Sequence, residues 1–287
     1  QSMKMADLII ATGGPAMVKA AHSSGKPALA SGAGNATMIF DETTNVEEAA
    51  HNARLSKTSD FGSGCSADGN LIIYGGIYDA MVKQLVAEGG YLADDDERAR
   101  LEKAMWDAEG HRTVPTVAVS PQKLAEAAGF KIPDDRKFIM VAGTGIGKEH
   151  KFSGEKLTTL LALYRYEGDF ENALKMMDEI YKVGGRGHSC GIYSFNDDHI
   201  HALALRAPVT RIMVRQPQSK ANAGSAQNGM AMTSSMGCGT WGGNVVSENI
   251  ALKHYMNNTW VARPIMTDMP PEKELFGEFF DPAEATL

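Results

Sequence analysis

The sequence predicts an α/β protein, because short apolar runs typical of strands alternate with amphipathic helical patterns along its 287 residues. Two runs, residues 8–12 and 138–142, are apolar over nearly their whole length, as in buried parallel strands. Between such runs, residues 78–88 place Ala80, Leu85 and other apolar side chains at helical spacing. The alternation continues through most of the chain and indicates a parallel sheet covered by helices.

Turn and cap residues set the bounds of the predicted elements. Pro15 stands at an early helical position after Gly13 and Gly14, where its fixed φ suits a helix start. Residues 94–96 are three aspartates, which we interpret as a helix cap and not as a metal site. The predicted strands are residues 8–12, 28–30, 37–40, 70–74, 157–166, 189–194, 208–215 and 258–262, besides 138–142. The predicted helices are residues 15–21, 46–57, 78–88, 97–107, 121–128 and 169–183.

The composition is that of an ordinary globular protein and excludes several classes of function. Hydrophobic residues make up 43% and charged residues 22% of the chain. A net charge of −7 without a long basic run argues against a nucleic-acid partner. The three cysteines lie far apart, so we expect no metal site, no disulfide framework and a cytoplasmic location. No apolar run approaches a membrane span, so we expect no membrane partner.

The first predicted strand comes very early in the chain. Residues 8–12 form a buried-strand pattern, which needs neighbouring strands on both sides. Few residues precede it to supply them. We therefore expect this chain to be the C-terminal part of a longer protein.

Cys65 lies in a small loop broken by glycines, residues 59–69, between a predicted helix and a predicted strand. Glycine lets the backbone adopt unusual angles and pass close to a ligand. A cysteine in such a loop can be exposed and activated as a nucleophile. From the loop alone, a buried cysteine that acts as a small hydrophobic residue is the commoner alternative.

Other candidate residues also allow two interpretations each. Gly13 and Gly14 form a strand-to-helix turn, which holds a phosphate in some proteins and serves only steric needs in many others. His188 follows a glycine-rich turn and is either a proton carrier near a thiol or a histidine that shapes the turn. Arg211 and Arg215 lie on one face of a predicted strand. They either hold an anionic substrate or face solvent or another subunit.

Several segments together resemble the coenzyme-A-acylating aldehyde dehydrogenases, including the aldehyde half of the bifunctional alcohol/aldehyde enzymes. The resemblance covers nearly the whole chain in the order of the family. The segments that carry it are residues 11–21, 23–28, 32–35, 41–43, 56–58, the Cys65 loop, 152–157, 187–188, 237–244 and 248–249. Residues 214–218 and 228–230 resemble the sulfoacetaldehyde-type members in particular.

The resemblance implies an aldehyde-dehydrogenase-like fold with three parts. Residues 1–34 would be the end of a Rossmann-like dinucleotide-binding domain, and residues 35–240 the catalytic α/β domain. Residues 241–287 would supply an oligomerisation strand and a tail, which implies a homodimer or homotetramer. The first half of the dinucleotide domain, with the residues that choose between NAD and NADP, would be absent from this sequence.

The resemblance also implies roles for individual residues. Cys65 would be the nucleophile that forms a thioester, with NAD or NADP as hydride acceptor and coenzyme A as co-substrate. Glu155 would contact the nicotinamide ribose; without the resemblance it is better explained as a solvated charge. The glycines at 13, 14 and 32 would line the cofactor site.

A missing carboxylate favours transfer of the acyl group to coenzyme A. Hydrolytic relatives carry a glutamate 34 residues before the nucleophile, and that count from Cys65 reaches Ser31. Without a general base, water is a poor nucleophile at neutral pH, whereas a thiol ionises more readily. The expected substrate is a small anionic aldehyde, sulfoacetaldehyde or succinate semialdehyde. Alternatives are an acetaldehyde-type acylating enzyme, a hydrolytic aldehyde dehydrogenase and a noncatalytic assembly fragment.

Overall fold

The computed structural model describes residues 2–266 and 269–283, and it confirms the predicted α/β class. The chain divides into one compact unit that ends at His254 and a second unit that begins at Tyr255. Within the described residues, none of the helices has the length and apolarity needed to cross a membrane.

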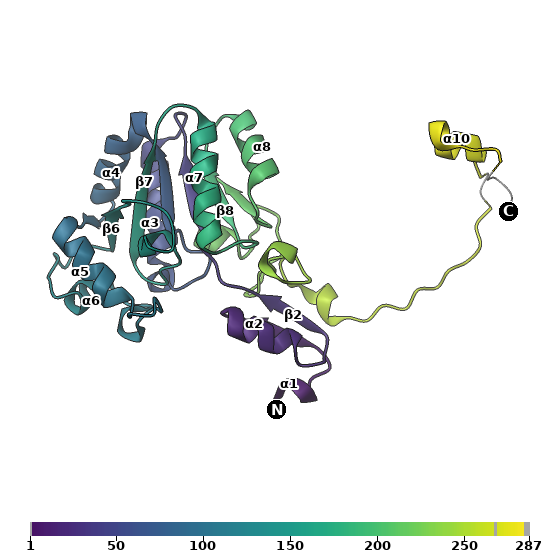
Figure 1. Cartoon of the computed structure of the whole chain (residues 1–287), viewed down its shortest axis with the longest axis horizontal. Coiled ribbons are helices and arrows are strands. Elements are labelled where there is room, and N and C mark those ends of the chain that lie inside the picture. The colour runs from purple at the N-terminus through teal and green to yellow at the C-terminus, as the bar shows by residue number, and fades with distance from the viewer. Residues whose placement is uncertain (1, 267–268, 284–287) are drawn as a thin grey trace. The chain divides into compact units, whose positions relative to one another are not determined.

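The larger unit is built on a parallel sheet of seven strands, in the order β5-β6-β7-β4-β3-β8-β9 (Figure 1). The strands are β3 (Thr37–Phe40), β4 (Asn70–Tyr74), β5 (Gly90–Leu92), β6 (Phe138–Ala142), β7 (Leu160–Tyr166), β8 (Cys190–Tyr193) and β9 (Ile212–Val214). Because every pair is parallel, the amino ends of all these strands meet at one edge of the sheet and the carboxyl ends at the other.

Two hydrophobic cores lie on opposite faces of this sheet, because successive side chains of a strand point to opposite sides. In β3, Ile39 packs on one face while Met38 and Phe40 pack on the other. Helices α3 (Val46–Thr58) and α4 (Tyr78–Ala87) cover the Met38 face. The Ile39 face is covered by α5 (Asp95–Met105), α6 (Pro121–Ala127), α7 (Phe170–Val183) and α8 (Asp197–Arg206).

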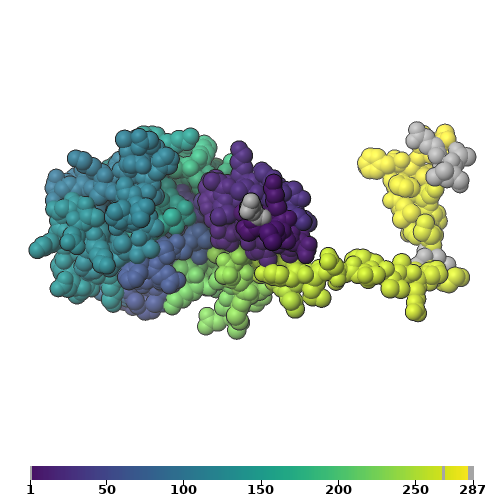
Figure 2. All heavy atoms as spheres, turned by 90° about the horizontal axis from the view of Figure 1, so that it is seen from below, coloured from purple at the N-terminus to yellow at the C-terminus, as the bar shows by residue number. Residues whose placement is uncertain are grey.

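A smaller layer precedes the main sheet. Strands β1 (Ile9–Thr12) and β2 (Ala28–Ser31) form a two-stranded parallel sheet, to which α2 (Pro15–His22) is packed, and α1 (Ser2–Met5) precedes them. In Figure 2 these N-terminal residues, in purple, form a lobe beside the green residues that follow β9. The hydroxyls of Thr12 and Ser235 join the two segments at 3.1 Å.

Most predicted elements are present, and the differences have local causes. Asp94 caps α5 through a reciprocal bond with Glu97, as the aspartate run predicted. Helix α8 was not predicted, although Asn196 caps it and two aspartates open it. Strand β9 covers only residues 212–214 of the predicted 208–215, and at its carboxyl end Arg215 adopts φ 51°, which ends the extended backbone. The long polar loop after β9 contains a short helix, α9 (Gln218–Ala221), whose Gln218 is buried.

The C-terminal unit contains a short helix, α10 (Glu272–Phe276). The structure contradicts the strand predicted at residues 258–262, since these residues belong to no ladder among those described. A strand exists only when its N–H and C=O groups pair with another strand, and a β-branched pattern alone does not supply one. The role of this segment in joining subunits, and the predicted domain bounds at residues 34 and 240, stay predictions.

Candidate active site

The loop that carries Cys65 has an unusual backbone. It leaves α3 through a single 3₁₀ turn, Ser59–Gly62, in which Asp60, Phe61 and Gly62 all have φ between 46° and 66°. Non-glycine residues rarely adopt this conformation, so the surrounding structure must hold it in place. A Cβ on Gly62 would lie 2.5 Å from the Thr158 carbonyl oxygen. The close packing of this turn thus fixes where the chain delivers Cys65.

The loop is also packed tightly against the segment that enters β3. A Cβ built on Gly34 would lie 1.9 Å from the carbonyl oxygen of Cys65. No residue with a side chain fits there unless the Cys65 backbone moves. Gly34 is therefore a position where glycine is required by close approach and not by φ.

The thiol of Cys65 contacts an imidazole. His188 Nε2 lies 3.0 Å from Cys65 Sγ, and His188 Nδ1 lies 2.9 Å from the Ser189 hydroxyl. His188 lies two residues before β8 and is fully buried. The structure thus brings together the two residues that were predicted as catalytic.

Burial keeps both members of this pair neutral. Burial, assisted by the nearby Glu155 carboxylate, raises the pKa of the Cys65 thiol to about 11. Burial, and then the Arg211 guanidinium, lower the pKa of His188 to about 3. The resting pair at neutral pH is a thiol beside an uncharged imidazole and not a thiolate–imidazolium ion pair. Forming the thiolate therefore needs a group that accepts the thiol proton.

Arg211 supports His188 from behind. It precedes β9 and is 5% exposed, and its guanidinium donates to the His188 carbonyl at 3.1 Å and to the Gly237 carbonyl at 2.7 Å. A third bond, of 3.1 Å, reaches the amide oxygen of Asn249, while Nε is without a partner among the described residues. Arg211 therefore lies close to the thiol–imidazole pair and still carries one unused donor.

Arg215 does not share this site, which corrects the expectation that the two arginines form one pocket. It follows β9 at the carboxyl edge of the sheet, while Arg211 and His188 lie at the amino edge. Its guanidinium donates to the Ser194 carbonyl at 2.6 Å and lies 4.4 Å from the centre of the Phe195 ring. The period-two argument placed both side chains on one face but not at one end of the strand.

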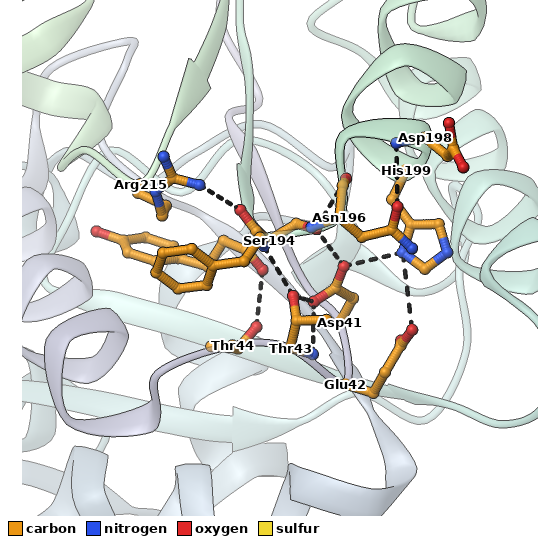
Figure 3. Close-up of polar contacts among 11 residues, drawn as sticks. Asp41, Glu42, Thr43, Thr44, Ser194, Asn196, Asp198, His199 and Arg215 are labelled. Carbon is orange, nitrogen blue, oxygen red and sulfur yellow. Dashed lines mark hydrogen bonds and ion pairs between the residues drawn. The ribbon is translucent and has the colours of Figure 1, made fainter.

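The neighbourhood of Arg215 is a polar cluster around Asp41 (Figure 3). Asp41, Glu42 and His199 offer ligand atoms within 4.8 Å of one another. However, both oxygens of Asp41 already accept hydrogen bonds, from Thr43 on one side and from Ser194 and His199 on the other. The cluster joins the carboxyl ends of β3 and β8 to the start of α8, which explains it as a structural centre.

An open cavity of about 580 Å³ lies beside the site. Gly32 and Glu155, two of the predicted cofactor residues, line it. The other two, Gly13 and Gly14, stand at the start of α2, whose Pro15 and Lys19 also line it. Seven of the lining residues are glycines, so a ligand can approach the backbone closely.

A second, much smaller cavity has a volume of about 10 Å³, which is at the lower limit for one water molecule. Its lining includes Cys65, Glu155 and two lysines, Lys57 and Lys156, which are each 1% exposed. Lys156 Nζ donates to Asn70 Oδ1 and to the Gly154 carbonyl, both at 2.9 Å. Neither lysine is among the site residues predicted from the sequence.

The sequence did carry a signal for Lys57. Helix α3 buries Ala49, Ala50 and Ala53, and Lys57 follows Ala53 by four residues, on the same face. A lysine on a stripe of buried alanines is not a solvated charge. Arg112 completes the group of cations, and no pattern pointed to it, because its position depends on a loop that follows α5.

The fold and the site therefore define an α/β protein with a thiol–imidazole pair at the amino edge of its parallel sheet, beside a glycine-lined cavity. No family model matches the chain. A curated relative, the sulfoacetaldehyde dehydrogenase of an Acholeplasma species, is 38% identical over 99% of this chain. The chain spans 59% of that relative's length.

Solved structures agree with this similarity. An acetylating aldehyde dehydrogenase from Geobacillus thermoglucosidasius matches 94% of this chain with a TM-score of 0.88 and 34% identity, over 59% of that protein. A propionaldehyde dehydrogenase from Rhodopseudomonas palustris, solved with bound CoA and an acylated cysteine, matches 85% with a TM-score of 0.73 and 25% identity, over 55% of that protein. Over nearly its whole length, the chain is therefore similar to acylating aldehyde dehydrogenases.

Proposed function

We propose that this chain forms the thioester-bearing part of an enzyme that oxidises a small aldehyde to its acyl-coenzyme A with NAD or NADP. The observation that carries the proposal is the contact of 3.0 Å between Cys65 Sγ and His188 Nε2, at the edge of an open cavity. A partly exposed cysteine in a strained, tightly held loop, paired with an imidazole, has the arrangement of a covalent nucleophile.

Cys65 attacks the aldehyde carbon, and the carbonyl oxygen gains the negative charge. In this proposal the backbone N–H of Cys65 donates a hydrogen bond to that oxygen. His188, held by Ser189 and Arg211, orients the thiol as a neutral hydrogen-bond partner. When bound, the nicotinamide cofactor supplies the hydride acceptor, and the thioester remains on Cys65.

The open cavity fits both an anionic dinucleotide and coenzyme A. Its glycine-rich lining admits close backbone contact, and Lys19, His22 and Arg186 supply positive or titratable groups around it. In this proposal Gly32 and Glu155 contact the cofactor, with Gly13 and Gly14 forming the turn before α2. We leave NAD and NADP as alternatives, because no residue of this cavity discriminates a 2′-hydroxyl from a 2′-phosphate.

Coenzyme A is the proposed acyl acceptor because no carboxylate occupies the position of the hydrolytic base. Ser31 stands there, at the end of β2, and is 4% exposed. The protein of known structure with bound CoA and an acylated cysteine supports the same outcome by its similarity. A hydrolytic enzyme would need another base to activate water.

Sulfoacetaldehyde is the proposed substrate, by similarity to the relative of that name. Succinate semialdehyde is the alternative, since a Clostridium kluyveri relative named for that substrate is 34% identical over 89% of this chain. Both are anionic, and Arg211, with its unused Nε, is the cation bonded to the His188 carbonyl. We also propose a homodimer or homotetramer joined through residues 255–263, where Trp260 and Val261 are largely exposed.

The test is an intact-mass measurement on the full-length protein mixed with NAD or NADP and sulfoacetaldehyde, without coenzyme A. We expect a sulfoacetyl adduct on the Cys65 peptide that disappears when coenzyme A is added and yields a thioester product. Free acid as the only product would favour a hydrolytic enzyme. No adduct with sulfoacetaldehyde, succinate semialdehyde or acetaldehyde would favour a noncatalytic role.

The two arginines offer a matched pair of variants for the anion hypothesis. Arg211→Met should raise the KM for sulfoacetaldehyde about tenfold more than the KM for acetaldehyde, because one charge-assisted hydrogen bond is lost only with the anion. Arg215→Met should change both KM values alike, since Arg215 lies at the opposite edge of the sheet. Steady-state kinetics with both aldehydes measures this, and equal effects of Arg211→Met on the two substrates would contradict an anion role.

A further inference from the structure

Glu155 is the one described residue that lines both cavities of the site. It borders the open cavity of about 580 Å³, and it also borders the small cavity of about 10 Å³, which Cys65 lines as well. Its Oε1 accepts a hydrogen bond of 3.0 Å from the Gly34 N–H, which holds the carboxyl in this position. Glu155 thus lies between the small cavity at Cys65 and the open cavity.

Formation of a thiolate on Cys65 requires an acceptor for the proton, and the two groups near the sulfur differ in their capacity for it. His188 is in direct contact, but it is fully buried beside the Arg211 guanidinium, which disfavours a second positive charge. Glu155 instead feels the charges of Lys57, Lys156 and Arg112, and it lines the same small cavity as Cys65. The charge on each side of the thiol therefore makes Glu155 the better proton acceptor.

We propose that Glu155 is the proton carrier of this site, which takes the Cys65 proton through one water molecule and releases it into the open cavity. The thiol S–H bond breaks, one O–H bond of the water breaks as another forms, and the carboxylate becomes a carboxylic acid. The acid then loses its proton to solvent through the open cavity. This proposal rests on the proposed role of Cys65 as nucleophile, and it adds a function to a residue otherwise expected only to contact the cofactor.

The groups that face Glu155 set its titration. Burial raises its pKa to about 7, while the Gly34 N–H and the cations of Lys57, Lys156 and Arg112 act in the opposite direction. Across the open cavity, Lys19, His22 and Arg186 also border the space. A carboxyl group that titrates near neutral pH can both accept and release a proton under ordinary conditions.

Among the cations that favour the charged form of Glu155, Lys57 has the largest effect. Its side chain is buried at the end of α3, lines the small cavity, and forms no ion pair within 4.0 Å in the described part of the chain. Asp68 and Glu155 are the carboxyl groups that act on it. By contrast, Lys156 is bonded to Asn70 and Gly154, and the Arg112 guanidinium is bonded to backbone carbonyls. Lys57 is thus the cation whose charge is available to act on Glu155, and we assign it as a positioning residue.

The test uses a probe that needs neither cofactor nor coenzyme A. The full-length protein is mixed with 4-nitrophenyl acetate, and acetylation of the Cys65 peptide is followed by mass spectrometry from pH 5 to pH 10. Cys65 attacks the ester carbonyl, 4-nitrophenolate leaves, and the thiol proton must pass to the base. We expect the wild-type rate to rise as the pH passes through about 7, because the carboxylate form of Glu155 is then present.

Glu155→Gln keeps the size of the side chain and an acceptor for the Gly34 N–H but cannot take a proton. At pH 8 its acetylation rate should fall about 100-fold, the usual contribution of a general base. The rise in rate near pH 7, which is the limb of the pH–rate profile, should vanish. Lys57→Met should move that limb to higher pH, because loss of a cation raises the pKa of the carboxyl group. Glu149→Gln, a carboxyl group outside both cavities, is the control and should match the wild type.

Three results would overturn the proposal. A Glu155→Gln protein that acetylates as fast as the wild type, or faster, would show that Glu155 only repels the thiolate. A uniform loss of rate with the limb still near pH 7 would show a structural role. A limb that stays in place in Lys57→Met would contradict the part assigned to Lys57. Failure of aldehyde oxidation in the wild type would concern the proposed function and would leave this ester-based measurement interpretable.

Discussion

Replacing Cys65 by alanine should abolish every covalent adduct on this site. The variant loses the sulfur that contacts His188, and a thioester cannot form on the loop without a cysteine sulfur. The other two cysteines, Cys190 and Cys238, are buried and stay in the variant, so they serve as internal controls. The full-length variant should yield no mass increase with aldehyde and NAD or NADP, and none on the corresponding peptide with 4-nitrophenyl acetate.

The Cys65→Ala variant should remain folded, because the loop is held by backbone contacts at Gly34 and Gly62 and not by the thiol. Its thermal unfolding midpoint should therefore stay close to that of the wild type. Acyl-coenzyme A production that persists in this variant would refute the mechanism. A shift of the adduct to Cys190 or Cys238 would show that the nucleophile was assigned to the wrong cysteine.

Replacing Gly34 by alanine should reduce thioester formation nearly as severely, although Gly34 carries no chemistry. The added carbon would lie 1.9 Å from the Cys65 carbonyl oxygen and 2.7 Å from its carbonyl carbon, both backbone atoms that cannot rotate away. The nucleophile must shift instead. A displacement of about 1 Å in a catalytic group costs roughly 100-fold in rate, and we expect a loss of that size in acetylation by 4-nitrophenyl acetate.

A matched control lies in the same loop. An added carbon at Gly64 meets no atom within 4 Å, so Gly64→Ala should acetylate at a rate within about threefold of the wild type, as expected for a surface change without contacts. The comparison separates displacement of the nucleophile from a general intolerance of larger residues. Equal rates in Gly34→Ala and Gly64→Ala would show that the loop adapts and that its position is not tightly determined.

The positions of the two arginines show the limit of arguments from strand periodicity. Alternation predicted that Arg211 and Arg215 lie on one face of one strand, but β9 spans only Ile212–Val214, so Arg211 precedes it and Arg215 follows it at opposite edges of the sheet. Three residues of extended chain separate them, so one guanidinium reaches the thiol–imidazole pair and the other reaches Ser194. Periodicity describes the face of a strand; the register of the sheet decides which end meets the site.

Lys57 and Glu155 show a different limit. Their charges suggested solvent exposure, and only the helix face shared with Ala53 hinted that Lys57 is buried. Residue 155 is far from residues 57 and 65 in the sequence, and the cavity that joins them arises where α3, the nucleophile loop and the segment before β7 meet. The pattern of a single segment does not show which distant segments it contacts in the folded protein.

The sequence alone determined the α/β class and most of the strands and helices, and it offered Cys65 and His188 as candidate catalytic residues. It could do so because hydrophobic periodicity, caps and glycine turns are local properties of the chain. The contact of 3.0 Å between these residues, the small cavity behind them and the separation of Arg215 from Arg211 were decided only by tertiary structure. These depend on strand register and on packing between distant segments, which fix distances that no local pattern contains.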